Sequence, residues 1–229
     1  MGLLDKIKRV RDVAQQTGTN ILLYGDAGTG KTSMMNTIPE EDQHKTLILS
    51  AESGLMSIRH SEMACEPIRD YPHFQSLLQK IREDDGKSIR WLCIDSISEI
   101  SEMCLDYHLG MTKDPRRAYG NLAKDIVQDL KLLRDLPVHT VSICKAKHTE
   151  DQRIIPSCPG SKIVEELPFI FDVVGLCRTE TNENNEVVHF VQFRKEDNNN
   201  AKDRTGSLQD FMKPDLAFII NTIKGEQKK

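Results

Sequence analysis

Residues 25–32 form the pattern G-x-x-x-x-G-K-[ST], read here as Gly25-Asp26-Ala27-Gly28-Thr29-Gly30-Lys31-Thr32, directly after an apolar run. The glycines let backbone N–H groups turn inward around phosphate oxygens, and the positive end of a following helix adds to the attraction. Lys31 can reach the β- and γ-phosphates of a nucleotide, and the Thr32 hydroxyl can hold Mg²⁺. We therefore predict a nucleotide site, with ATP and Mg²⁺ as ligands, that extends over residues 25–33 and so includes Ser33.

A second apolar stretch, residues 91–94, ends in Asp95. In P-loop NTPases such an aspartate helps to hold Mg²⁺. Thr32 and Asp95 are therefore the predicted magnesium residues. Many hydrolytic ATPases place a glutamate directly after this aspartate to polarise the attacking water, but Ser96 stands there in this chain.

The best candidate for the missing base is Glu52, which follows the apolar strand predicted at residues 46–50. The carboxyl ends of parallel strands open onto one crevice, so Glu52 is expected near the nucleotide. The alternative is that Glu52 is a helix-capping acid beside Ser53.

Apolar strands alternate with amphipathic helices, which predicts an α/β fold whose parallel sheet is covered on both faces. A late hairpin is expected from two strand-like runs separated by Asn182-Glu183-Asn184-Asn185. The chain reads as one domain, 1–229, with a frayed tail at 225–229. The expected strands are 20–24, 46–50, 89–94, 138–144, 169–178 and 187–194, and the expected helices are 2–16, 32–37, 74–81, 116–136 and 215–223.

Composition sets limits on function. The 229 residues are 38% hydrophobic and 29% charged, which is typical of a soluble globular protein, and the net charge of −4 leaves room for a local basic groove. The six cysteines lack any C-x-x-C pair, so we expect buried free thiols rather than zinc or disulfides. No apolar run reaches membrane-spanning length and residues 1–16 are not a signal peptide, so no membrane partner and a cytoplasmic location are expected.

The order of these motifs resembles the core of RecA-type recombinases, in which Ala51-Glu52 matches the segment that carries the catalytic glutamate. The chain resembles more closely the short phage-encoded RecA-like proteins, often called phage nucleotide-binding proteins, some of which are single-strand annealing recombinases. The resemblance runs from about residue 18 to 223. Its most specific segments are 25–32, 49–55, 91–96 and 201–206. It implies a RecA-like P-loop NTPase core, action in the host cytoplasm, and assembly into a homo-oligomeric ring or filament.

The resemblance also implies roles for further residues. In RecA-like filaments, cations of one subunit reach the nucleotide of the next, which makes Lys202 and Arg204 candidate catalytic fingers beside Lys31 and Glu52. The alternative is a solvated polar loop. Lys145 matches the position of a polar γ-phosphate sensor, although the family commonly has glutamine there, and its sensing role stays open.

RecA-like proteins bind DNA through two loops, which match residues 110–117 and 145–162 here. Acidic residues dilute the charge of both segments and neither carries an aromatic stacking platform, so ordinary surface loops are the alternative. The candidate contacts to single-stranded DNA are Lys113, Arg116, Arg117, Lys145, Lys147, Arg153 and Lys162.

The leading interpretation is a DNA-stimulated ATPase that promotes annealing or strand exchange, with a single-strand DNA-binding protein as a further candidate partner. The alternative is a nucleotide-dependent switch or loader that acts on a protein partner in replication or packaging. A small-molecule kinase would need an arginine-rich lid, and a GTPase would need an N-K-x-D motif; neither appears in the sequence. The amphipathic helix predicted at residues 2–16 is expected to pack on its own domain or on a neighbouring subunit.

Overall fold

The computed structural model describes residues 18–52 and 54–225, so the predicted helix at 2–16 lies outside the described residues. Its strands are β1 (Asn20–Gly25), β2 (Thr46–Ser50), β3 (Ala64–Pro67), β4 (Trp91–Asp95), β5 (His139–His148), β6 (Ile154–Pro156), β7 (Val173–Thr181), β8 (Val187–Gln192), β9 (Lys202–Asp203) and β10 (Phe211–Met212). Its helices are η2 (Thr32–Thr37), α2 (Glu40–Gln43), η3 (Leu55–Ile58), α3 (Tyr71–Glu83), α4 (Ile97–Met111), α5 (Pro115–Arg134), α6 (Ser161–Ile170) and α7 (Leu216–Lys224).

A ten-stranded, mostly parallel sheet runs through the described part of the chain in the order β10-β8-β7-β1-β5-β4-β2-β3. The strands from β3 to β7 in this order are parallel, whereas β8 runs antiparallel to β7 and β10 runs antiparallel to β8. β6 pairs with the outer end of β5, and β9 pairs with β7. The α/β class, the parallel sheet and the late hairpin are therefore confirmed.

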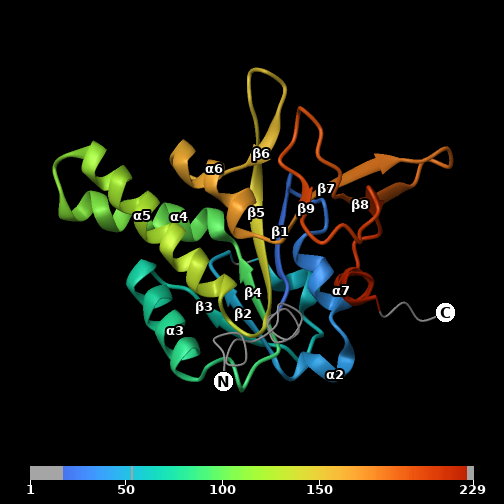
Figure 1. Ribbon diagram of the computed structural model, residues 1–229, viewed down its shortest axis with the longest axis horizontal. Helices are drawn as coiled ribbons and strands as arrows, with labels where there is room; N and C mark the ends of the chain where they lie inside the picture. Colours follow the sequence, from blue (N-terminus) through green and yellow to red (C-terminus); the bar gives the residue numbers. More distant parts are fainter. Residues whose placement is uncertain (1–17, 53, 226–229) are drawn as a thin grey trace, which may run out of the picture.

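Both faces of the sheet are covered, because successive side chains of a strand point to opposite faces. In β1, Leu22 and Tyr24 pack under α3, α4, α5 and α6, whereas Ile21 and Leu23 pack under η2 and α7. Figure 1 shows α3, α4, α5 and α6 on one side of the strands and α7 on the other side. None of the described helices combines the length and apolar character needed to cross a membrane.

Three predicted segments differ from the structure. Residues 169–172 end helix α6 and lead into β7 instead of starting a strand. The predicted loop 145–162 consists of the outer end of β5, the strand β6 and the first turn of α6. The first candidate DNA loop, 110–117, shrinks to three residues, 112–114, between α4 and α5.

These differences have a local cause. Backbone pairing with β6 carries β5 beyond its apolar part, so the mostly polar residues 145–148 continue the strand. The α6 segment contains Pro168 and branched Ile163 and Val164, which lower helix propensity. Tertiary packing of Ile163, Leu167 and Ile170 against the core outweighs that preference.

The burial of the cysteines agrees largely with the expectation. All six are free thiols, and Cys93, Cys104, Cys144 and Cys177 are buried. Cys158 is half-buried, and the exposed Cys65 is the exception.

Candidate nucleotide site

The phosphate loop connects β1 to η2 at the carboxyl edge of the sheet. Gly28 and Gly30 have φ angles of 80° and 85°, in the left-handed region that glycine adopts without strain. A Cβ atom at Gly28 would meet nothing within 4 Å, so the loop is open on the side where a ligand would lie. The segment after the loop is a 3₁₀ helix of six residues, so the helix predicted at 32–37 is present with tighter winding than expected.

Lys31 is folded back over the loop. Its ammonium donates hydrogen bonds to the carbonyl oxygens of Gly25 (2.8 Å) and Asp26 (2.7 Å) and a longer one to Thr29 Oγ1 (3.4 Å). These carbonyls hold the positive charge at the loop, where phosphate oxygens would compete for it.

Thr32 and Asp95 meet as predicted. The Thr32 hydroxyl donates a hydrogen bond of 2.7 Å to Asp95 Oδ2. Asp95 is only 2% exposed, and within the described residues its Oδ1 atom has no hydrogen-bond partner. Burial raises the pKa of this carboxyl; the Thr32 hydrogen bond and Lys31 oppose that effect, and nearby Glu52 adds to it.

The unpaired Oδ1 atom of Asp95 indicates whether the site suits a metal. A buried carboxylate oxygen without a donor is costly, and a hard cation would satisfy it. Oxygen atoms of a hydroxyl and a carboxylate are the ligand types that Mg²⁺ prefers. Thr32 and Asp95 therefore fit Mg²⁺, which would be held at the loop end of β4.

Glu52 lies just beyond β2 and faces the same pocket. Its Oε1 atom accepts a hydrogen bond of 2.7 Å from the Ser96 hydroxyl, and Lys145 Nζ lies 3.9 Å away. The backbone N–H of Glu52 donates to Asp95 O at 3.1 Å, which ties the glutamate to the end of β4. The helix η3 that follows has no side-chain cap, so the capping alternative finds no support.

Lys145, which pairs with Gly25 where β5 leaves the parallel sheet, links two carboxylates. Its ammonium is hydrogen-bonded to Glu99 and lies near Glu52. The hydrogen bond to Glu99 is the main reason that the pKa of Lys145 is raised. Ser96 caps α4 by accepting from the Glu99 N–H at 3.4 Å, so the same helix start positions both partners.

These groups border one pocket of about 460 Å³. Its lining includes the phosphate loop, Glu52, Asp95 and Lys145, which pairs with Gly25 in the sheet. Of the predicted nucleotide residues, all but Thr29 line the pocket directly, and Thr29 is held inside the loop by its hydroxyl, which donates to Asp26 O at 2.8 Å.

The β5–β6 hairpin contacts the phosphate loop, which the sequence did not predict. The His148 imidazole lies 3.0 Å from both carboxylate oxygens of Asp26. Tyr24, the residue just before the loop, donates a hydrogen bond to Ile154 O at 3.3 Å and accepts one from Asn200 N at 2.9 Å. Burial is the largest cause of the raised pKa of Tyr24, so its hydroxyl stays a donor.

Lys202 and Arg204 are occupied within the chain. Lys202 Nζ donates to the carbonyl oxygens of Pro168 and Phe171. Arg204 donates to Phe169 O at 2.9 Å and pairs with Asp172 at 2.9 Å. Both cations therefore satisfy carbonyl groups at the end of α6. Neither lines the nucleotide pocket of its own chain.

The predicted DNA contacts lie on separate projections (Figure 1). One is the tip between α4 and α5, and the other is the β5–β6 hairpin followed by the start of α6. Lys145 belongs to the pocket and not to the tip of the hairpin. The remaining predicted contacts are exposed: Lys113, Arg116, Arg117, Lys147, Arg153 and Lys162.

Sequence reasoning missed Ser96 as a partner of Glu52, Glu99 as a partner of Lys145, and His148 as a partner of Asp26. The spacing of Ser96 and Glu99 at a helix start was a usable signal for Glu99, because an N-cap and its third residue lie close together. No local signal joins His148 to Asp26, because their contact depends on the register of β1 and β5.

The fold and the site define a P-loop nucleotide-binding protein of the ATPase type. The sequence profile described as AAA domain matches residues 17–205, which is most of the chain. The chain therefore belongs to the AAA domain family. No curated protein matches the sequence.

Proposed function

We propose that this AAA domain protein hydrolyses ATP with Glu52 as the general base. The carrying observation is that Glu52, Lys31 and Asp95 border the same pocket although they come from three different strand ends. The Ser96 hydrogen bond at 2.7 Å holds the glutamate in place where a neighbouring glutamate is lacking. Bound Mg²⁺ supplies charge neutralisation at the β- and γ-phosphates.

Within this proposal, the residues of the chain act in a defined order. Lys31 leaves the Gly25 and Asp26 carbonyls for the phosphate oxygens, because charged oxygens accept more strongly than carbonyl oxygens. Glu52 takes a proton from the attacking water, while Ser96 keeps its carboxylate oriented. Lys145 lines the same pocket with its ammonium 3.9 Å from Glu52, so it is the residue that we propose for the sensor position implied by the RecA resemblance.

We further propose that the protein is a RecA-like phage recombination protein that binds single-stranded DNA and promotes annealing or strand exchange as a ring or filament. The support is a direct contact between the phosphate loop and a basic projection. His148 touches Asp26 of the phosphate loop, while Lys147 and Arg153 belong to the same hairpin. Ordering of the loop by ATP would therefore alter a surface that can neutralise phosphates.

Exposed apolar side chains support a second candidate function, a nucleotide-dependent switch that acts on a protein partner. Met111 and Phe169 are 66% and 74% exposed, and Met111 ends α4 beside the tip that carries Lys113. Exposed apolar side chains of this size suit a protein interface better than a phosphate backbone.

The test compares phosphate release with and without single-stranded DNA, for the wild type and for Lys31→Ala. We expect DNA to stimulate release by the wild type, and expect Lys31→Ala to abolish both ATP binding and ATP-dependent DNA binding. Electron microscopy should show rings or helices only when DNA and a slowly hydrolysed ATP analogue are both present. Hydrolysis that DNA leaves unchanged, together with monomers in every condition, would favour the switch.

A further inference from the structure

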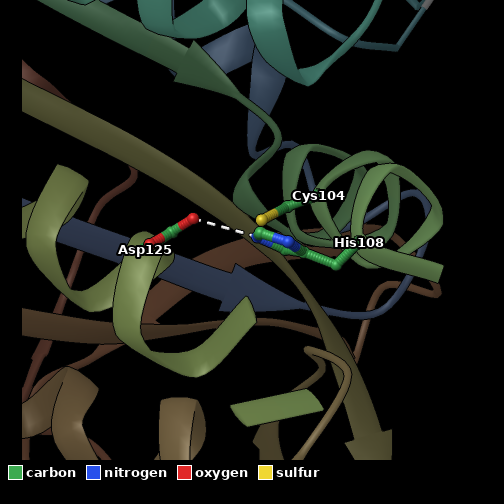
Figure 2. A group of neighbouring side chains, drawn as sticks. All are labelled: Cys104, His108 and Asp125. Atoms are coloured by element: carbon green, nitrogen blue, oxygen red, sulfur yellow. Dashed lines mark hydrogen bonds and ion pairs between the residues drawn. The ribbon is translucent and has the colours of Figure 1, made fainter. Parts of the chain in front are cut away.

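A cluster of three metal-binding side chains lies apart from the nucleotide pocket. Cys104 and His108 stand one turn apart on α4, and Asp125 faces them from α5 (Figure 2). One donor atom from each residue lies within 4.8 Å of the other two. Figure 2 shows the thiol, the imidazole and the carboxylate directed toward one another. We propose that Cys104, His108 and Asp125 bind a zinc ion that fastens α4 to α5.

The donor set has the right chemistry. Sulfur, imidazole nitrogen and carboxylate oxygen are the three ligand types that zinc takes in proteins. A hard ion such as Mg²⁺ has little affinity for sulfur, so the set also discriminates between the two metals. Three protein ligands leave a fourth position for water, as in other open zinc sites.

The distances require only a small rearrangement. Tetrahedral zinc with ordinary bond lengths separates its donors by about 3.4 to 3.7 Å. His108 Nε2 and Asp125 Oδ2 are 2.9 Å apart, so the ion would replace the proton between them and widen this pair slightly. The other donors are within reach by side-chain rotation, since all three pairs are under 4.8 Å.

Charge and access also fit. A Cys104 thiolate and an Asp125 carboxylate together offset the two charges of zinc, so the filled site is neutral inside the helix interface. Binding releases the Cys104 thiol proton, and His108 would bind the ion through the unprotonated Nε2 of a neutral imidazole. Cys104 is fully buried, but the Asp125 side chain is 27% exposed and gives the ion a path inward.

Aromatic rings and a second carboxylate surround the three proposed ligands. The centroid of the His108 ring lies 6.4 Å from that of Tyr71 and 5.3 Å from that of Tyr107. The two tyrosine rings are 5.9 Å apart and pack beside the cluster. A second carboxylate, Asp129, lies one turn beyond Asp125 and accepts a hydrogen bond of 2.7 Å from the Tyr71 hydroxyl. Burial raises the pKa of Asp129 to about 6, and the charge of Asp125 adds to that shift.

The position of the proposed zinc site suggests what the metal would do. Ser96, the N-cap of α4, is hydrogen-bonded to Glu52, and the other end of α4 leads into the projecting tip that carries Lys113 and Arg116 (Figure 1). A metal between α4 and α5 would therefore stiffen the connection between the nucleotide pocket and that tip. Zinc binding itself does not depend on the proposed ATPase or DNA functions.

The test uses Co²⁺ as a spectroscopic probe of the full-length protein, in excess Mg²⁺ so that the phosphate loop does not bind the probe. We expect one Co²⁺ per chain, with the near-ultraviolet absorption of a thiolate–cobalt bond. Cys104→Ser should remove that absorption, and His108→Ala and Asp125→Asn should each weaken binding more than about tenfold. Cys65→Ser, which changes the exposed thiol, is the matched control and should bind like the wild type.

A second measurement separates metal binding from folding. Nucleotide binding reports whether each variant is folded, and zinc content is measured after purification. A chelator should lower the Tm of the wild type and leave that of Asp125→Asn unchanged. The proposal is overturned if folded wild type shows no thiolate absorption, or if the absorption persists in Cys104→Ser.

Discussion

The Ser96 hydroxyl donates a hydrogen bond of 2.7 Å to Oε1 of Glu52. Ser96 follows Asp95, the proposed magnesium ligand, in sequence, whereas Glu52 lies just beyond the end of a neighbouring strand, β2. This hydrogen bond therefore holds the Glu52 carboxylate beside position 96, where many ATPases carry a glutamate and this chain carries serine. In the mechanism we propose, this serine orients the general base instead of supplying it.

Glu52→Gln should bind ATP with nearly unchanged affinity but hydrolyse it about 10²- to 10⁴-fold more slowly, because the amide cannot take a proton from water. The measurement is phosphate release at saturating ATP, beside the affinity for a slowly hydrolysed analogue. Ser96→Ala should reduce turnover less, because it removes only the orienting hydrogen bond. Glu183→Gln in the late hairpin is the matched control, and equal rates for Glu52→Gln and this control would remove Glu52 as the base.

Asp95→Asn should raise the Mg²⁺ concentration needed for half-maximal hydrolysis by about 10- to 100-fold. The amide can still accept the Thr32 hydrogen bond, so local geometry is kept while the negative charge is lost. The same change should raise the Tm measured without Mg²⁺ and nucleotide, because burial of the orphaned carboxylate is costly. An unchanged Mg²⁺ requirement would show that the metal is held elsewhere.

How much of this site could be read from the sequence depends on how local each contact is. Gly25 to Ser33 and Asp95 were predictable, because a short pattern after an apolar strand fixes their backbone. The partners of Glu52 and Lys145 were not, because they depend on which strand ends and helix starts lie side by side. Topology decides such contacts, and one residue of register shift would redirect every side chain.

The fold shows the same division. Strong apolar periodicity located α3, α5 and α7, as well as the buried strands β1, β2 and β4. Helix α6 was missed because Pro168 and branched residues oppose a helix locally, and it is stabilised by packing and by Lys202 and Arg204 at its end. The cluster of Cys104, His108 and Asp125 was also missed, since Asp125 reaches it from another helix.

Lys147→Ala with Arg153→Ala should weaken binding of single-stranded DNA and reduce its salt dependence. Each lost phosphate contact lowers the slope of log affinity against log salt by about 0.7. Binding is measured by fluorescence anisotropy over a range of salt concentrations with ATP analogue present. Lys80→Ala together with Arg82→Ala on α3 is the matched control, because it removes the same charge away from the hairpin. A slope that both double variants lower equally would assign the effect to net charge alone.

Two buried groups should give opposite pH dependences of stability. The folded pKa of Asp129 is raised from 3.8 to about 6, so its contribution is greatest below pH 3.8 and is lost as pH rises to about 6. The folded pKa of His139 is lowered from 6.5 to about 4 by burial, so its contribution is complete above pH 6.5 and is lost as pH falls to about 4. Between pH 4 and 6 the two effects partly cancel.

Asp129→Asn should therefore expose the His139 effect. Between pH 6 and pH 4, the free energy of unfolding of this variant should fall by about 2 kcal/mol more than that of the wild type. The variant should also be more stable than the wild type at pH 7, because the asparagine can still accept the Tyr71 hydrogen bond without a buried charge. Urea unfolding in the presence of a chelator measures both quantities. Parallel pH profiles for the two proteins would contradict the assignment to Asp129.

Mixing two inactive variants tests whether Arg204 acts on a neighbouring subunit. Arg204→Ala keeps an intact phosphate loop, whereas Lys31→Ala keeps Arg204. If Arg204 completes the site of the next subunit, a Lys31→Ala subunit can supply the arginine to an Arg204→Ala subunit, and mixing should restore part of the lost hydrolysis. If Arg204 only holds Phe169 and Asp172 at the end of α6, Arg204→Ala should be less stable and mixing should restore nothing. Circular dichroism of each variant checks the fold, and phosphate release at several mixing ratios decides between the two roles, because restored activity should peak near equal amounts.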